Sequence, residues 1–131
     1  MTRPPILLDV SRLIWRVWTH RLPTGIDRVC LAYLDHYGPG ARAVVQRGRF
    51  RLILSPRRSH ELFALLRQGG PGFRSALVAL LAGAAATGGE RLGLRGALYL
   101  NIGHPGLDFS GLPGWLRKLG VKPVYLVHDL I

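Results

Sequence analysis

The segment "ILLDV", residues 6–10, sets the expected fold because it is a short, continuous apolar run near the start of the chain. Such runs are typical of strands that are buried on both faces in a parallel sheet. Two more runs of this kind follow, "RGALYLNIG" at residues 95–103 and "VKPVYLVHDLI" at residues 121–131. We therefore expect these three segments to be strands of a parallel sheet.

Helical patterns separate these runs. Apolar residues recur at helical spacing over residues 26–37, and the "GPG" at residues 38–40 ends that pattern. Ser55 and Pro56 suit the start of a second helix, as N-cap and first helical residue. Glycines at 69 and 70 suit its end. Two more helices are expected over residues 71–86 and 112–120.

Two segments remain between these elements. Residues 41–55 predict two strands around a turn near Arg47 and Gly48. Residues 11–25 mix Trp, Arg, Pro and Gly, and we interpret them as a long loop. The element order predicts an α/β fold, a Rossmann-like three-layer sandwich with a mostly parallel sheet. Residues 1–131 are expected to form one domain.

Composition narrows the class of protein. Hydrophobic residues make up 48% of the chain, which argues against intrinsic disorder. The formal net charge is +11, so the surface attracts phosphate groups of nucleic acids, nucleotide diphosphates or anionic lipids. The single cysteine, Cys30, excludes an internal disulfide and any CxxC motif, and we expect it to be a buried, inert thiol.

Arginines are concentrated in the expected hairpin and just after it, at positions 47, 49, 51, 57 and 58. Alternating arginines in a hairpin predict one basic face in solvent. That face could also contact anionic lipid or nucleic acid. No nucleic-acid-binding motif accompanies these arginines, so nucleic acid is not an expected partner.

The first candidate site precedes the helix at residues 26–37. Thr24 and Gly25 stand where free backbone N–H groups and the helix dipole favour a phosphate. Gly25 would let a ligand approach the backbone closely. An ordinary helix start explains the same residues, with Thr24 as the cap and Asp27 as a first-turn acid that complements the dipole.

Two further candidates follow strands, at the edge of the sheet where α/β proteins bind ligands. Gly103 and His104 lie in an irregular "GHPG" turn, and His128 and Asp129 end the last strand. A histidine can donate to a phosphate or sugar oxygen and can move a proton. A solvated turn histidine at 104 and a backbone-bonded histidine at 128 remain the alternatives. The five histidines are scattered, so no metal site is expected.

These segments together resemble a known family. The stretches "LLDVSRLIWR", "LPTGIDRVCLAYLDHY", "YLNIGHPGLD" and "LRKLGVKPVYLVHDLI" resemble the N-terminal domain of retaining glycosyltransferases with the GT-B fold. The likeness is to the family-4 group, which includes bacterial mannosyltransferases of polysaccharide assembly. It covers both ends of the chain, and residues 47–95 match only by the order of elements.

The resemblance implies two Rossmann-like domains across a cleft, of which this chain is the acceptor-side one. It implies that Gly25 and its neighbours, Thr24, Asp27 and Arg28 among them, border the phosphates of a nucleotide-sugar donor. His128 would act at the transferred sugar as the catalytic residue, with Asp129 beside it. The "GH" pair of Gly103 and His104 would line the acceptor side. The donor is a substrate, and neither a cofactor nor a metal is expected.

One departure from the family pattern concerns the Glu-x7-Glu motif of its C-terminal domain. The chain's glutamates are Glu61 and Glu90, which do not form that motif. We therefore expect a glycosyltransferase fragment that lacks the nucleotide-sugar domain and is inactive alone. The expected location is cytoplasmic, with peripheral contact at the inner face of the membrane as an option. The alternative is a stand-alone α/β module that binds a phosphate-bearing ligand or a protein partner.

Overall fold

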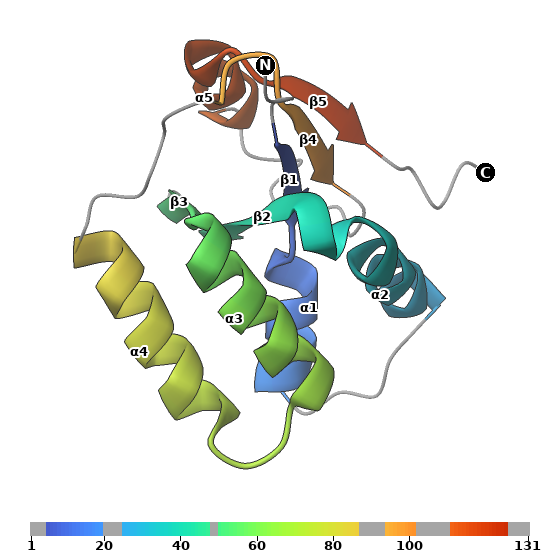
Figure 1. The fold of residues 1–131 in the computed structure, drawn as a ribbon, viewed down its shortest axis with the longest axis vertical. Coiled ribbons are helices and arrows are strands. Elements are labelled where there is room, and N and C mark those ends of the chain that lie inside the picture. Colours follow the sequence, from blue (N-terminus) through green and yellow to red (C-terminus); the bar gives the residue numbers. More distant parts are fainter. Residues whose placement is uncertain (1–4, 20–24, 48–49, 87–93, 102–110, 126–131) are drawn as a thin grey trace.

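The structure is a computed structural model that describes residues 5–19, 25–47, 50–86, 94–101 and 111–125. The described residues form five strands, five α-helices and one short 3₁₀ helix, and Figure 1 shows how these elements are arranged. The elements in chain order are β1 (Ile6–Asp9), α1 (Ser11–Trp18), α2 (Gly25–Tyr37), η1 (Gly38–Gly40), β2 (Ala41–Arg47), β3 (Phe50–Ile53), α3 (Pro56–Gln68), α4 (Phe73–Ala86), β4 (Leu98–Asn101), α5 (Gly111–Leu119) and β5 (Lys122–Tyr125).

The strands form one mixed sheet in the order β3-β2-β1-β4-β5. Strand β1 pairs in parallel with β2 on one side and with β4 on the other, and β4 pairs in parallel with β5. Strand β3 alone runs antiparallel, paired with β2. The predicted α/β class with a mostly parallel sheet is thus confirmed.

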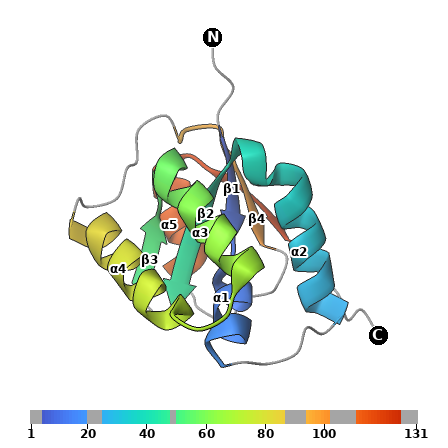
Figure 2. The same cartoon turned by 60° about the horizontal axis from the view of Figure 1, so that its bottom comes forward.

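Helices cover both faces of the sheet. Helix α5 packs on one face, and α1, α2, α3 and α4 gather on the other (Figures 1 and 2). This arrangement follows from the strands, whose successive side chains point to opposite faces and are apolar on both. Leu7 belongs to the core on the α5 side and Leu8 to the core on the other side.

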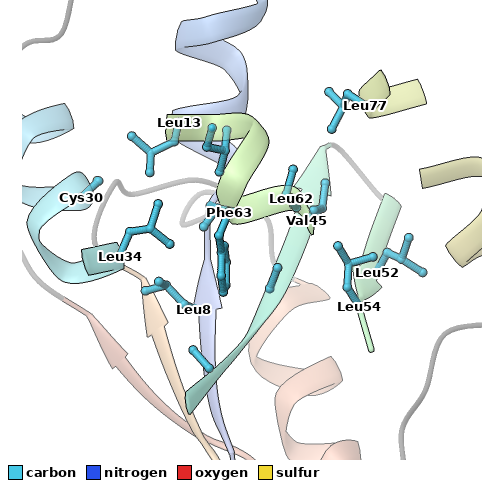
Figure 3. Close-up of a cluster of buried hydrophobic side chains, with 14 of the residues drawn as sticks. Leu8, Leu13, Cys30, Leu34, Val45, Leu52, Leu54, Leu62, Phe63 and Leu77 are labelled. Atoms are coloured by element: carbon cyan, nitrogen blue, oxygen red, sulfur yellow. The ribbon is translucent and has the colours of Figure 1, made fainter. Parts of the chain in front are cut away.

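The larger core lies between the sheet and the four helices. Leu34 of α2, together with Leu62 and Phe63 of α3, packs over Leu8 of β1 (Figure 3). Cys30 belongs to the same cluster, as the expectation of a buried thiol requires. Burial raises the pKa of the Cys30 thiol to about 11, so the group stays protonated near neutral pH.

Residues 11–18 form helix α1, so the prediction of a long loop over residues 11–25 is wrong for this part. Leu13 is buried, and Ile14, Val17 and Trp18 pack partly buried against the larger core. These four positions form one helical stripe that interspersed arginines conceal in the sequence. The N-cap residue of α1 is Val10, whose side chain cannot accept a hydrogen bond, so the usual sequence signal for a helix start is missing.

The hairpin of β2 and β3 confirms the two predicted strands but not the single basic face. Arg47 pairs with Phe50 across the strands, and Gln46 pairs with Arg51. Because neighbouring pairs of a ladder alternate between faces, Arg47 and Arg51 point to opposite sides of the sheet. The guanidinium of Arg51 lies 5.9 Å from the ring centroid of Trp115 on the α5 side.

The predicted ends of helix α3 are confirmed. The Ser55 hydroxyl accepts a hydrogen bond from the Arg58 backbone N–H at 3.2 Å, and Pro56 is the first helical residue. Gly69 follows the helix with φ of 57°, a conformation that glycine adopts without strain.

Strand β5 is the outer strand of the sheet on its side. The Lys122 N–H donates to the Ala97 carbonyl at 2.9 Å, so the nitrogen of the next residue, Pro123, faces away from β4. Proline lacks an N–H, and its position here removes a donor from the open edge. Leu98 and Val124 are 40% and 44% exposed, so this side of the sheet also presents apolar side chains.

Candidate functional site at the carboxyl edge of the sheet

The strand order places a topological switch point beside β1. The chain goes from β1 to β2 and β3 on one side, and later continues through β4 and β5 on the other side. In open α/β sheets, ligands bind beyond the carboxyl ends of the strands at such a point. The candidate site is therefore the edge formed by the carboxyl ends of β1, β2 and β4.

A buried network of polar side chains occupies this edge. The Asp9 carboxylate, at the end of β1, accepts hydrogen bonds from the Tyr99 hydroxyl and from the Gln46 side-chain amide. The Tyr99 hydroxyl in turn accepts from the Gln46 amide at 2.8 Å and from the Asn101 amide at 3.0 Å. The Ser11 N–H donates to the other Asp9 oxygen at 3.0 Å. Three strands and the start of α1 are thereby tied together.

Burial governs the charge of this network. It raises the pKa of Asp9 above its ordinary value, although the hydrogen bonds from Ser11, Tyr99 and Gln46 oppose that shift. Burial and the nearby Asp9 carboxylate raise the pKa of the Tyr99 hydroxyl, which therefore stays protonated and donates to Asp9. Asp9, Gln46, Tyr99 and Asn101 are each at most 6% exposed. The network therefore holds the ends of the strands together from inside the protein, and its side chains are not available to contact a ligand.

A second polar contact joins the two helices that follow β1. The Arg12 Nε of α1 lies 3.0 Å from the Asp27 Oδ1 of α2. The Asp27 side chain is 5% exposed and the Arg12 side chain 36%. A carboxylate at this depth needs a cation or hydrogen-bond donors to remain charged. The pair therefore fixes the start of α2 against α1.

The Arg12→Gln substitution is expected to lower the free energy of unfolding by about 1–3 kcal/mol, since it removes the cation from a buried carboxylate. A matched control is Arg67→Gln. Arg67 lies 3.1 Å from Asp35, with side chains that are 47% and 70% exposed. That exposed pair should contribute at most about 1 kcal/mol. Urea denaturation of both variants measures the difference, and equal losses would contradict a special role for the Arg12–Asp27 pair.

Three of the predicted site residues lie in the described part of the chain, all in the first turn of α2. Gly25 is the first residue of α2, is exposed, and has open space where a side chain would begin. Arg28 is exposed. Asp27 is 3% exposed and turned toward Arg12, so its carboxylate is held by this contact.

The other predicted site residues lie outside the described residues. They are Thr24, Gly103, His104, His128 and Asp129. Their roles remain predictions from the sequence. The structure does not test whether they meet at one site.

Sequence analysis missed the buried network. Two of its residues could have been noticed as polar groups in apolar strands. Asp9 interrupts the apolar run of β1, and Asn101 ends the apolar run "LYLN". Nothing in the sequence links them to Gln46 or Tyr99. The pairs Asp9–Gln46 and Asp9–Tyr99 are separated by 37 and 90 positions.

The described residues contain no group of three or more His, Cys, Asp or Glu side chains that could hold a metal ion. None of the helices in the described ranges has the length and apolar character required to cross a membrane.

Comparisons with known proteins add no assignment. No protein-family model matches the sequence, and neither curated protein sequences nor solved structures give a significant match.

Proposed function

We propose that this chain is the N-terminal, acceptor-side domain of a retaining glycosyltransferase with the GT-B fold. In this proposal the domain is Rossmann-like, and the complete enzyme transfers a sugar from a nucleotide-sugar donor to a glycan or lipid-linked acceptor in polysaccharide biosynthesis. The strand order β3-β2-β1-β4-β5, with its switch point between β1 and β4, is the observation that supports it.

The order of the motifs along the chain agrees with this proposal. Gly25 begins α2, the Gly103–His104 pair follows β4 in the sequence, and the His128–Asp129 pair follows β5. In a parallel sheet the segments after successive strands emerge at one edge. A family whose site is built from such segments is therefore compatible with this topology.

The proposal gives the described residues different tasks. Gly25 and Arg28 are exposed in the first turn of α2, where backbone N–H groups and a guanidinium suit donor phosphates. Asp27 acts through Arg12 by holding that turn against α1. The buried network around Asp9 keeps the carboxyl ends of β1, β2 and β4 in a fixed relation. Rigid support of this kind holds substrate-binding groups in position.

The first test examines the gene and its product. If the natural reading frame continues past Ile131 into a domain with a Glu-x7-Glu motif, the complete product should release nucleoside diphosphate from a nucleotide sugar when an acceptor is present. A panel of uridine- and guanosine-diphosphate sugars, with lipid and glycan extracts as acceptors, measures this release. Residues 1–131 alone should release none.

A stop codon directly after Ile131, with no partner chain that restores activity, would contradict the transferase proposal. The chain would then be better interpreted as a stand-alone module that binds a phosphate-bearing ligand or a protein. Isothermal titration of residues 1–131 with nucleoside diphosphates would test that alternative directly.

A further inference from the structure

An apolar groove of about 530 Å³ lies between helices α1 and α4 and the adjoining ends of β2 and β3. Trp15 and Trp18 of α1 form one wall, and Leu77 and Val78 of α4 form the other. Phe50, the first residue of β3, contributes to the lining at the sheet. The groove therefore has aromatic and aliphatic walls from three separate parts of the chain.

The groove gathers apolar side chains that solvent can reach. Trp15, Phe50 and Val78 are 42%, 46% and 56% exposed, and all three line it. Isolated exposed apolar residues are common, but contiguous ones mark binding surfaces. A volume of this size is within the range of small-molecule sites, about 300–1,000 Å³.

The polar part of the groove is basic. Arg47 lines it, and the Arg47 guanidinium lies 4.5 Å from the ring centroid of Trp15. Arg12 also lines the groove, whereas no acidic side chain does so among the described residues. Among the residues that the structure describes, no carboxylate forms an ion pair with Arg47. The groove thus combines an apolar interior with a cation that an anionic ligand can reach.

We propose that this groove binds one molecule of a long-chain alkyl phosphate, with the hydrocarbon chain between α1 and α4 and the phosphate at Arg47. The walls match a hydrocarbon chain, and the positive charge matches the phosphate. Nucleic acid fits less well, because Arg47 already covers the Trp15 ring and leaves less of it for a base to stack on. This inference does not depend on the transferase proposal.

Decyl phosphate, used below its critical micelle concentration, is the test ligand, and calorimetry together with tryptophan fluorescence gives the readout. We expect saturable binding of one molecule per chain and a changed emission from Trp15 and Trp18. Val78→Glu should weaken binding at least about tenfold, because it places a charge where the hydrocarbon chain lies. Val124→Glu is the matched control, since Val124 is 44% exposed but lies on β5, outside the groove. It should bind like the unmodified chain.

The phosphate contact has its own test. Arg47→Gln should weaken decyl phosphate binding about tenfold and leave decanol binding unchanged, because only the phosphate needs the charge. Arg57→Gln removes the same charge from α3, where Arg57 is 90% exposed beside Glu61, and should have little effect. Circular dichroism checks folding, and Phe50→Gln replaces Val78→Glu if that variant does not fold.

Several results would overturn this inference. Inorganic phosphate binding as tightly as decyl phosphate would reduce the site to an anion site without a hydrocarbon pocket. Binding to phosphatidylglycerol vesicles without binding of monomeric decyl phosphate would indicate a membrane surface instead. Equal losses for Val78→Glu and Val124→Glu would show that the groove is not the site. Because the readout is binding, none of these results depends on sugar transfer.

Discussion

Replacing Tyr99 with phenylalanine is expected to lower the free energy of unfolding by about 3 kcal/mol, although it removes a single oxygen atom. The Tyr99 hydroxyl donates to Asp9 and accepts from Gln46 and Asn101, so the change deletes three buried hydrogen bonds. A buried bond to a carboxylate contributes about 1.5–3 kcal/mol, and a neutral one about 0.5–1.5 kcal/mol. Urea denaturation measures the loss.

Tyr125→Phe is the matched control for this experiment. Tyr125 lies on the neighbouring strand β5, and its ring centroid is 6.4 Å from that of Tyr99. The structure gives its hydroxyl no hydrogen bond among the described residues, so the same substitution should change stability by less than about 0.5 kcal/mol. Comparable losses at both positions would mean that the network around Asp9 has no special stabilising role.

The cost of Tyr99→Phe should also depend on pH. The folded state raises the pKa of Asp9, so this group favours folding below its unfolded pKa, and that contribution is lost as pH rises through its folded pKa. The Tyr99 hydrogen bond opposes this rise, so its removal raises the folded pKa further. The difference in stability between the variant and the unmodified chain should therefore increase as pH rises through the folded pKa of Asp9, which lies above its ordinary value. A difference that does not change with pH would contradict an ionisable Asp9 in the network.

Replacing His128 with alanine in the complete enzyme should lower the turnover of sugar transfer about 100-fold or more. The reason is that the proposed function places this side chain at the reacting sugar, and a positioned histidine typically contributes 10²–10⁴-fold, on the order of 3–5 kcal/mol. The measurement is acceptor-dependent release of nucleoside diphosphate. The circular dichroism spectrum and the urea midpoint should not change.

His60→Ala provides the control for a general effect of losing a histidine. His60 is exposed on α3, in a helix that covers the sheet and does not follow a strand of the proposed site. It should leave turnover within about twofold of the unmodified enzyme. Turnover of His128→Ala that is close to the unmodified value would remove His128 from the catalytic site, while the fold and the groove would be unaffected.

Much of the fold was predictable because its signals are local. The apolar runs of β1 and β4, the cap at Ser55 and the glycine at 69 each act within a few residues of where they stand. Helix α1 was missed because Arg12 and Arg16 interrupt its apolar stripe and because its N-cap residue, Val10, is not a capping residue type. Such a pattern can be recognised as a helix only when the surface that Leu13 packs against is known.

The candidate site was less predictable because it depends on contacts between distant segments. Arg47 and Arg51 looked like one basic face, but the pairing register separates them, and Arg47 reaches Trp15 in α1. The bond between Gln46 and Tyr99 spans 53 positions, and no spacing rule in the sequence predicts it. Local patterns thus indicate where strands end, but not which polar side chains meet there.

The open edge of β5 limits the contacts that another protein could make on that side of the sheet. Because Pro123 presents no donor there, an added strand would miss a ladder bond at this position. The exposed side chains of Leu98 and Val124 still offer apolar contact. Association at this flank would therefore rest mainly on the hydrophobic effect, which weakens on cooling. Any complex formed there should be held more tightly at 25 °C than near 4 °C.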